Sequence, residues 1–328
     1  MILPRFVLVT GAGGFIGHHL VKRLVSYGIR VRGVDLKFPE FGESAASEFE
    51  ILDLRTAKGC DAAVGGGIEH VFHLAADMGG IGYITASLAE IAKNNVLINA
   101  HMLQAAQARR VSRFLFASSA CVYADYRQQS EAAETLVEAD AYPAAPEPGY
   151  GWEKLFTEHL CQYYNHDYNL DTRIVRFHNV YGPLGTYTCG KEKAPAAICR
   201  KIALAQGPNA EIEIWGDGEQ TRSFMYISDC ISGLVKIMYE THYPDPINLG
   251  RSELISINGL VETVAKIAGK RIRKVHNLDA PQGVRGRNSD NQLLKSLLDW
   301  EPEITLAEGL IPTYRWIEQM VVKDESSS

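Results

Sequence analysis

The sequence predicts an α/β fold, in which a parallel sheet carries helices on both faces and a smaller lobe is attached. Strand-like apolar runs alternate with helical runs through the first half of the chain, as a parallel sheet requires. A glycine-rich loop also joins the first strand to the first helix. The length of 328 residues accommodates one large α/β domain together with a smaller lobe.

The predicted elements follow one another in chain order. Short apolar runs are expected to be strands, and longer runs with helical spacing are expected to be helices. The strands are expected at Phe6–Thr10, Ile29–Asp35, His70–Ala75, Arg113–Ser118, Arg173–Phe177 and Pro246–Gly250, and the helices at His18–Tyr27, Ile91–Arg109 and Ile257–Ala268.

The glycine loop follows the first strand and reads Gly-Ala-Gly-Gly-Phe-Ile-Gly. Glycine lets the backbone turn sharply and approach a pyrophosphate closely, and the free N–H groups of the next helix bind its phosphates. This context predicts a Rossmann-type doubly wound sheet with a dinucleotide at the loop. The residues expected to hold the dinucleotide there are Gly11, Gly13, Gly14, Phe15, Ile16 and Gly17.

Two acidic residues bear on the identity of the dinucleotide. Asp35 ends the second predicted strand, where a carboxylate accepts hydrogen bonds from the adenosine ribose hydroxyls and repels a 2′-phosphate. NAD is therefore favoured over NADP as the cofactor. Asp53 is a candidate to face the adenine amino group, although an ordinary loop carboxylate explains it nearly as well.

Glycine and proline divide the chain into short elements after about Val180. We therefore expect residues 1–180 to form the dinucleotide-binding domain and residues 181–328 to form mainly a substrate-binding lobe. Segments near 223–255 are expected to return to the first domain, so the two domains are not separated at a single position in the chain.

Composition excludes several classes of function. The net charge of −6 argues against a nucleic-acid binder, which needs a basic surface. The six cysteines include no C-x-x-C pair, so we expect no metal site, and they suit a reducing compartment. Neither a signal peptide nor a membrane-spanning apolar stretch is evident. We expect a cytoplasmic enzyme with no membrane or nucleic-acid partner.

Tyr150 and Lys154 stand four residues apart and therefore share one face of a helix. A neighbouring ammonium favours the phenolate, which can remove a hydroxyl proton. Such a pair alone is equally explained by an exposed helix surface. Together with the glycine loop, however, it resembles the extended short-chain dehydrogenase/reductase family, the NAD-dependent epimerases and dehydratases. The resemblance implies that Tyr150 is the acid/base for hydride transfer and that Lys154 also holds the nicotinamide ribose.

The same resemblance implies further properties of the chain. Ser119 matches the third catalytic hydroxyl of the family, which mostly acts on nucleotide sugars. The 4,6-dehydratases of the family carry an Asp-Glu pair where this chain has Ala120 and Cys121, so dehydration is not expected. Members often form homodimers through paired helices, which here are Ile91–Arg109 and Tyr150–Tyr164.

Longer strings resemble one branch of the family, the GDP-mannose 3,5-epimerases. The resemblance runs from the glycine loop to about Trp316, nearly the whole chain. The strings that carry it are Ala75–Gly80, Ser118–Cys121, Arg176–Pro183, Glu192–Ala197, Trp215–Ser223 and Gly283–Asn291.

This branch implies conversion of GDP-mannose to GDP-L-galactose, with GDP-L-gulose as the product of 5-epimerisation alone. Transient oxidation at C4 makes the hydrogens on C3 and C5 acidic, and inversion then needs a base on one ring face and an acid on the other. A thiol and a partly desolvated lysine both ionise within reach of neutral pH. By resemblance, Cys121 and Lys193 are that pair. Without the resemblance, Cys121 would be interpreted as a buried core residue and Lys193 as a solvated surface charge.

Substrate contacts follow from the matched strings. A nucleotide diphosphate needs fixed cations and hydrogen-bond donors, and arginine suits phosphate oxygens. Arg287, two residues beyond Arg285, is an alternative for the role of Arg285. The residues implied by resemblance are Gly79, Ser119, Cys121, Asn179, Glu192, Lys193, Ala194, Lys201, Gln220, Arg222 and Arg285.

Two other functions compete with this one. A 4-epimerase of another nucleotide sugar would use Ser119, Tyr150 and Lys154 but would have no need for Cys121 and Lys193. A non-catalytic, NAD-responsive binding protein would not need the intact set of Ser119, Tyr150 and Lys154.

Overall fold

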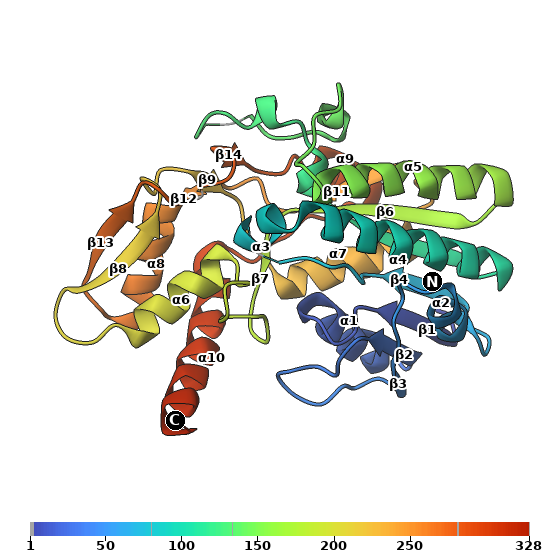
Figure 1. Cartoon of the computed structure of the whole chain (residues 1–328), viewed down its shortest axis with the longest axis horizontal. Coiled ribbons are helices and arrows are strands. Elements are labelled where there is room, and N and C mark those ends of the chain that lie inside the picture. Colours follow the sequence, from blue (N-terminus) through green and yellow to red (C-terminus); the bar gives the residue numbers. More distant parts are fainter. Residues whose placement is uncertain (1–2, 80, 133, 281, 328) are drawn as a thin grey trace.

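The computed structural model describes residues 3–79, 81–132, 134–280 and 282–327. It consists of a large sheet domain, on the right in Figure 1, and a smaller lobe beside it. In the described chain, seven parallel strands form one sheet in the order β11-β6-β5-β4-β1-β2-β3. The bounds are β1 Phe6–Thr10, β2 Arg30–Asp35, β3 Glu48–Ile51, β4 His70–His73, β5 Arg113–Ser119, β6 Asp171–Phe177 and β11 Pro246–Leu249.

The chain leaves β1 in opposite directions across the sheet, so the strand order reverses between β1 and β4. In a doubly wound sheet, ligands bind outside the carboxyl ends of the strands at this switch point. The fold class predicted from the sequence is confirmed, and the predicted strands and helices form with ends shifted by a few residues.

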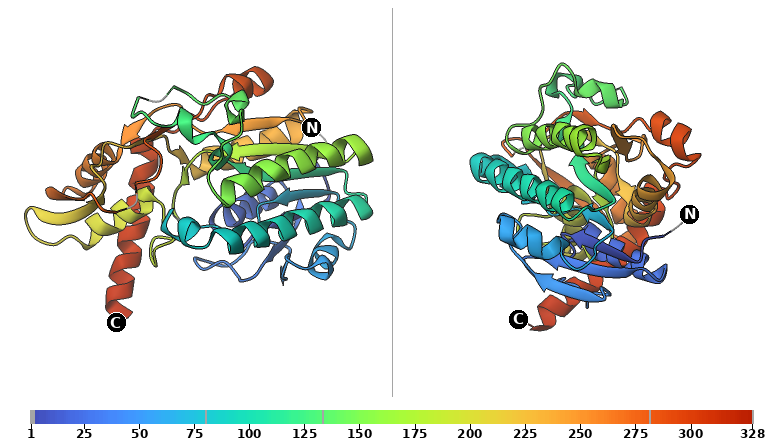
Figure 2. Two further views of the ribbon diagram at one scale, coloured as in Figure 1. Left: turned by 45° about the horizontal axis from the view of Figure 1, so that its top comes forward. Right: turned by 90° about the vertical axis from the view of Figure 1, so that its right-hand side faces the viewer.

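Helices cover both faces of the sheet, as the two views of Figure 2 show. Alternate residues of β1 point to opposite faces: Val7 and Val9 belong to one core, and Phe6 and Leu8 to the other. The first core is covered by α1 (Phe15–Ser26), α7 (Ile227–Glu240) and α9 (Gln292–Leu298), and the second by α2 (Ala57–Val64), α4 (Leu88–Ala108) and α5 (Tyr150–Tyr168). The short helix α3 (Ile81–Ala86) precedes α4.

The smaller lobe has its own hydrophobic core. Helices α6 (Ala194–Leu204), α8 (Ile257–Ala268) and α10 (Leu306–Ser327) pack with the parallel pair β8 (Ala210–Trp215) and β13 (Ile272–Asn277). The strands that lie between the two parts are β7 (Val180–Tyr181), β9 (Thr221–Arg222), β10 (Met225–Tyr226), β12 (Ile255–Ser256) and β14 (Gly286–Arg287).

Several segments of the second half of the chain pack with the sheet domain. Helix α7 and strand β11 lie within the predicted returning segments near 223–255 and pack with the sheet domain. Helix α9 also returns, because its buried Leu294 and Leu298 join the core beside β11 and α7. The sheet domain therefore includes a late segment in addition to those near 223–255.

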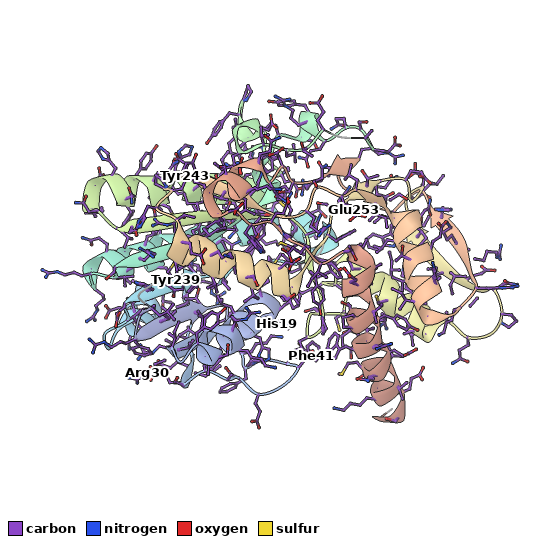
Figure 3. The ribbon with its side chains drawn as sticks, turned by 180° about the vertical axis from the view of Figure 1, so that it is seen from behind. His19, Arg30, Phe41, Tyr239, Tyr243 and Glu253 are labelled. Carbon is purple, nitrogen blue, oxygen red and sulfur yellow. The ribbon has the colours of Figure 1, made fainter. Side chains whose placement is uncertain are left out.

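One loop of the sheet domain contacts the smaller lobe directly. Residues 36–47 connect β2 to β3. The Phe41 ring centroid lies 5.7 Å from that of Tyr187 and 5.1 Å from that of Trp316 on α10. Figure 3 labels Phe41 at this junction, with His19 nearby. The His19 imidazole donates to the Pro183 carbonyl at 3.0 Å, so two separate contacts join the lobes here.

Among the described residues, no helix is long and apolar enough to cross a bilayer. Within the same residues, no group of three or more His, Cys, Asp or Glu side chains is arranged to hold a metal ion.

Candidate active site

The glycine loop lies at the carboxyl end of β1 and leaves no space for side chains. A Cβ on Gly13 would lie 2.2 Å from the Lys37 carbonyl oxygen, and one on Gly17 would lie 2.1 Å from the Gly11 carbonyl oxygen. No described side chain caps the N-terminus of α1, and its first turn holds no acidic residue. Its N–H groups and its positive dipole end are therefore available to phosphates, so the loop fits a dinucleotide pyrophosphate.

Asp35 is fixed beside this loop by backbone donors. Its Oδ2 accepts from the Gly13 N–H at 2.9 Å, and its Oδ1 accepts from the Leu36 N–H at 2.7 Å. A carboxylate has further acceptor positions, which suit ribose hydroxyls. Asp53 is engaged elsewhere: both of its oxygens accept from Arg55, and this hydrogen bonding lowers the pKa of the Asp53 carboxyl.

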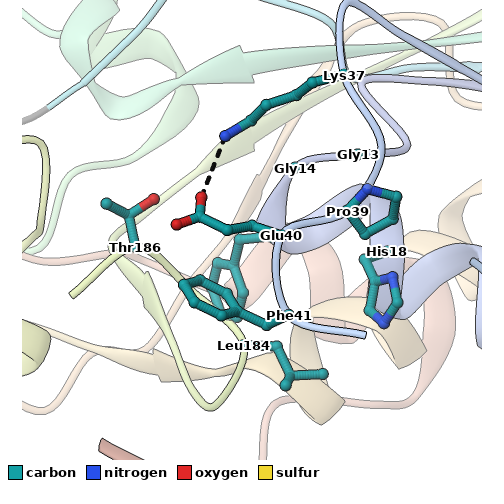
Figure 4. Close-up of a pocket in the computed structure, with 10 residues that line it drawn as sticks. Gly13, Gly14, His18, Lys37, Pro39, Glu40, Phe41, Leu184 and Thr186 are labelled. Atoms are coloured by element: carbon teal, nitrogen blue, oxygen red, sulfur yellow. Dashed lines mark hydrogen bonds and ion pairs between the residues drawn. The ribbon is translucent and has the colours of Figure 1, made fainter. Parts of the chain in front are cut away.

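A pocket opens at the glycine loop, between the sheet domain and the segment 184–186 (Figure 4). Lys37 and Glu40 form an ion pair of 3.1 Å in its wall. Its lining residues are Gly13, Gly14, Phe15, His18, Lys37, Pro39, Glu40, Phe41, Leu184 and Thr186.

Ser119, Cys121 and Tyr150 converge where β5 ends and α5 begins. The Ser119 hydroxyl accepts from the Cys121 N–H at 3.2 Å and hydrogen-bonds the phenol of Tyr150. Gly151 allows this approach, because a Cβ there would lie 2.3 Å from the Cys121 carbonyl oxygen. Three of the predicted catalytic residues are thus in one place.

Lys154 is buried one helical turn beyond Tyr150. Its Nζ lies 5.4 Å from the centroid of the Tyr150 ring and 4.7 Å from that of Phe116. Glu153 Oε1 lies 3.8 Å from the same Nζ and is also buried. A buried ammonium is costly without a nearby negative charge, so Glu153 compensates Lys154.

Glu153 is in turn held by amides of α4. Asn95 donates to its Oε1 at 2.9 Å, and Asn99 donates to its Oε2 at 3.1 Å. Burial raises the pKa of the Glu153 carboxyl, against the lowering effect of Lys154 and the two amides. Sequence reasoning missed these three residues, although Glu153 stands directly before the predicted Lys154.

The titration of the Tyr150 phenol is shifted by its surroundings. Burial raises its pKa well above the ordinary value, and the nearby Glu153, Cys121 and Glu147 raise it further, whereas the Ser119 hydrogen bond lowers it. Burial and these acidic neighbours thus act against the effect that the sequence argument assigned to Lys154.

Cys121 lies between two charged side chains. Arg287 Nη1 is 3.8 Å from its Sγ, and Arg287 Nη2 donates to Glu147 Oε1 at 2.5 Å. Burial raises the pKa of the Cys121 thiol to about 11, Glu147 adds to this rise, and Arg287 opposes it. Glu147 was missed from the sequence, although its position three residues before Tyr150 is a signal that could have been used.

Lys193, the N-cap residue of α6, approaches the same thiol from the smaller lobe. It interacts electrostatically with Cys121, Cys230 and Arg287. Its side chain is exposed, while neighbouring protein atoms desolvate the ammonium and lower its pKa. Elements of both lobes therefore carry the predicted pair, and Cys121 and Lys193 lie within electrostatic range of each other.

Several predicted substrate residues carry polar atoms that have no protein partner among the described residues. Gln220 Oε1 and Glu192 Oε2 are buried in this way, as are Ser223 Oγ, three residues after Gln220, and Asn288 Oδ1, next to Arg287. Buried polar atoms are normally satisfied, so such a group favours a site that a polar ligand completes. Asn179 Nδ2 donates to the Ser223 carbonyl at 3.1 Å, which places it beside the same segment.

The predicted cations separate into two groups. Burial lowers the pKa of Arg222 to about 10, and the charge of Arg287 lowers it further. Arg285 instead lies nearer the surface, in ion pairs with Glu131 and with Asp217, the latter at 2.8 Å. The sequence left open whether Arg285 or Arg287 contacts the substrate. In the structure, Arg287 is the one that lies beside Cys121.

The remaining predicted residues lie at the edges of the site. Lys201 donates to the Glu213 carbonyl at 2.7 Å. Ala194 begins α6, directly after Lys193. Gly79 follows β4, and a Cβ there would lie 2.9 Å from the Tyr83 ring.

Comparison with known families decides the kind of enzyme. The model of the NAD dependent epimerase/dehydratase family matches residues 7–250. The chain belongs to this family. This match confirms the predicted family, the predicted NAD cofactor and the prediction of an epimerase-type enzyme.

Two curated relatives span almost the whole chain. GDP-mannose 3,5-epimerase of Arabidopsis thaliana is 44% identical over 322 residues, covering 98% of this chain and 84% of the relative. GDP-mannose 3,5-epimerase 1 of Oryza sativa subsp. japonica is 43% identical, covering 98% of this chain and 83% of the relative.

Solved structures agree with the fold. UDP-glucuronic acid 4-epimerase from Bacillus cereus, in complex with UDP-glucuronic acid and NAD, is 27% identical with a TM-score of 0.79, covering 96% of this chain and 99% of that one. An epimerase of Methanothermobacter thermautotrophicus, 24% identical with a TM-score of 0.86, covers 98% of this chain and 95% of that one.

Proposed function

We propose that this chain epimerises GDP-mannose at C3 and C5, giving GDP-L-galactose, and GDP-L-gulose when only C5 is inverted. The observation that carries the proposal is the position of the Cys121 thiol, beside the Ser119–Tyr150 pair and within electrostatic reach of Lys193. An enzyme that inverts only C4 needs no such second acid–base pair. The nucleotide-sugar substrate is supported by the names of the relatives.

The first chemical step takes place at the C4 hydroxyl of the sugar. Bound NAD supplies a reversible hydride acceptor for C4 and, in its oxidised form, a positive ring charge. Tyr150 removes the hydroxyl proton, Ser119 orients the oxygen, and Lys154 supplies a buried positive charge that stabilises the phenolate.

Inversion follows at the carbons next to the new ketone. Cys121 and Lys193 approach from different lobes, so a sugar bound between them presents one face to the thiol and the other to the amine. One group removes the proton from C3 or C5, and the other delivers a proton to the opposite face. Tyr150 then returns its proton to the C4 oxygen as the ketone is reduced.

Arg222 and Arg287 provide positive charge for the diphosphate. Both are partly or fully buried. Arg287 contacts the Cys121 sulfur, and Arg222 interacts electrostatically with the same thiol. Arginine donors suit phosphate oxygens in such a desolvated place. Gln220 and Glu192, with their unsatisfied buried oxygens, are the proposed acceptors for sugar hydroxyls.

Incubation with GDP-mannose in deuterated water tests the proposal. We expect deuterium at both C3 and C5 of the recovered nucleotide sugars, together with new L-sugar products. A Cys121→Ser variant is expected to lose this exchange while retaining NAD. Inversion at C4 without deuterium at C3 or C5 would instead support the 4-epimerase alternative.

We also propose a homodimer formed through α4 and α5. The exposed face of α5 carries Trp152, Phe156 and Tyr163, each more than half exposed. Their spacing of four and seven residues places them on one stripe of the helix, opposite the buried Lys154. Large aromatic side chains on one stripe are typical of a protein interface.

A cytoplasmic location is part of the proposal as well. All six cysteines are free thiols in the structure. Such a set suits a reducing compartment.

A further inference from the structure

Cys121, Glu147 and Arg287 form a closed group, here called the thiol cluster. The Arg287 guanidinium contacts both other members, at 3.8 Å from Cys121 Sγ and 2.5 Å from Glu147 Oε1. The thiol hydrogen-bonds the Glu147 carboxylate. The Glu147 N–H also donates to the Cys121 carbonyl at 3.0 Å, so backbone and side chain both fix this carboxylate beside the sulfur.

Glu147 has no part in the reaction proposed above, yet it is the nearest anion to the sulfur. We propose that Glu147 is a positioning residue that holds Cys121 as a thiol, so that Cys121 is the resting acid of the pair and Lys193 is the resting base. This inference rests on the proposed function for its substrate, but the state of the thiol can be measured without one.

The charges that face the thiol come from several elements. Glu147 precedes α5, Arg287 belongs to β14, Arg222 belongs to β9, and Lys193 caps α6, while Tyr150 is a neutral neighbour on α5. After burial, Glu147 has the largest influence on the pKa of Cys121, and it raises it. Arg287 has the opposite effect, but its charge is shared with Glu147, so it does not release the thiolate.

Lys193 complements this arrangement. Desolvation and Arg287 lower the pKa of its ammonium, which favours the neutral amine, whereas the burial and the carboxylate at Cys121 favour the neutral thiol. The two shifts therefore act in the directions that this division of roles requires.

The proton transfer balances without any further reactant. The C–H bond next to the C4 ketone breaks, its proton forms an N–H bond on Lys193, and the electron pair enters the enolate. The S–H bond of Cys121 then breaks, its proton forms the new C–H bond on the opposite face, and the electron pair stays on sulfur beside Arg287. Transfer of one proton from the Lys193 ammonium to the thiolate restores both groups.

Alkylation of Cys121 as a function of pH tests the assignment directly. Iodoacetamide reacts with the thiolate, so its rate reports the titration of the sulfur. The full chain is used in a Cys189→Ser background, because Cys189 is an exposed cysteine whereas Cys60, Cys161, Cys199 and Cys230 are buried. We expect Glu147→Gln to move the midpoint to lower pH, which increases the rate near neutral pH about tenfold for each unit of pKa lost.

Two further variants control for a structural effect. Glu147→Asp keeps the negative charge, but its side chain is one methylene shorter, so the charge lies farther from the sulfur. The alkylation midpoint of this variant is therefore expected between those of the parent and Glu147→Gln. Glu131→Gln removes a carboxylate from Arg285 instead of Arg287 and is expected to leave the thiol midpoint unchanged. Near-ultraviolet circular dichroism and NAD retention establish that each variant is folded.

Deuterium exchange from GDP-mannose supplies the second readout. Because a thiol that acts as acid must be protonated, the alkaline limb of the exchange rate is expected at lower pH in Glu147→Gln than in the parent. An alkylation midpoint that is unchanged or raised in Glu147→Gln overturns the inference. Absence of exchange in the parent refutes the proposed function instead, while the alkylation result still decides the role of Glu147.

Discussion

Gly151 and Cys121 meet so closely that a Cβ on Gly151 would lie 2.3 Å from the Cys121 carbonyl oxygen. The first turn of α5 and the turn after β5 therefore fix each other, and through them Tyr150 and the thiol are held at one separation. A backbone contact of this kind cannot be relieved by rotating a side chain.

Gly151→Ala is expected to separate these two turns. Overpacking of a buried site costs about 1–3 kcal/mol of stability, and the displaced Tyr150 loses its hydrogen bond to Ser119. We expect a lower urea midpoint and a reduced rate of deuterium exchange. The matched control is Gly82→Ala, since a Cβ on Gly82 meets nothing within 4 Å. Equal behaviour of the two variants would show that the contact does not constrain the site.

Asp35→Ala is expected to weaken retention of NAD. The substitution removes the acceptor that orders the Gly13 N–H and the acceptor proposed for the ribose hydroxyls. Hydrogen bonds to charged groups contribute about 1.5–3 kcal/mol, which corresponds to roughly ten- to a hundredfold in affinity. Calorimetric titration with NAD and NADP measures the change and its effect on cofactor preference. Asp61→Asn, at a surface ion pair with Arg109, is the control; retained NAD affinity in Asp35→Ala would contradict the prediction.

Glu153→Gln is expected to shift the pH dependence of the reaction. The carboxylate raises the pKa of the Tyr150 phenol, so its removal lowers that pKa. Since the phenolate is the form that removes the C4 hydroxyl proton, the ascending limb of the exchange rate is expected to move to lower pH. Rates measured across the pH range with equal NAD loading check this. A limb that stays in place or moves to higher pH would exclude this role for Glu153.

Stability is expected to fall as the pH drops below the ordinary range of histidine. Burial lowers the pKa of His73 and of His178 to about 3, so the folded chain keeps both neutral while the unfolded chain protonates them near 6.5. The unfolded state then binds more protons, and each histidine costs about 1.4 kcal/mol between roughly pH 7.5 and 5.5. Urea unfolding at both pH values measures the loss. His73→Gln is expected to reduce the difference between the two pH values by that amount, and an undiminished difference would refute the assignment.

Phe156→Glu is expected to produce monomers. The side chain lies in the middle of the exposed aromatic stripe of α5, where a carboxylate in a buried interface is unpaired. Light scattering at fixed concentration compares the variant with Leu278→Glu, which alters an exposed apolar side chain of the smaller lobe. The proposed interface would be refuted if both variants were dimers or if the parent protein were a monomer.

Sequence reasoning was sufficient where function follows from local spacing. The glycine loop, Asp35 and the pair of Tyr150 and Lys154 occupy places that a strand, a turn and one helical face determine by themselves. The alternation of strands and helices predicts a parallel sheet, in which the carboxyl ends of the strands meet at one edge, and the strand order that brings these residues together comes from the structure.

The sequence did not identify residues whose importance comes from packing. Arg285 and Arg287 are two residues apart in the chain, at and just before β14, and only the positions of Asp217 and Cys121 decide which arginine faces the surface and which the thiol. In the sequence, Glu153 cannot be distinguished from an exposed helix carboxylate. Its role follows from the hydrogen bond that Asn95, on another helix, donates to it. Helix α9 was missed for the same reason, since its partners lie in distant segments.

The contact of Phe41 with Trp316 links the cofactor pocket to the C-terminal helix. The loop that lines this pocket is thereby attached to the lobe that carries Lys193. A movement of the smaller lobe relative to the sheet domain would therefore also move the loop that lines the dinucleotide pocket. We expect exchange of the sugar nucleotide to affect retention of the dinucleotide through this contact.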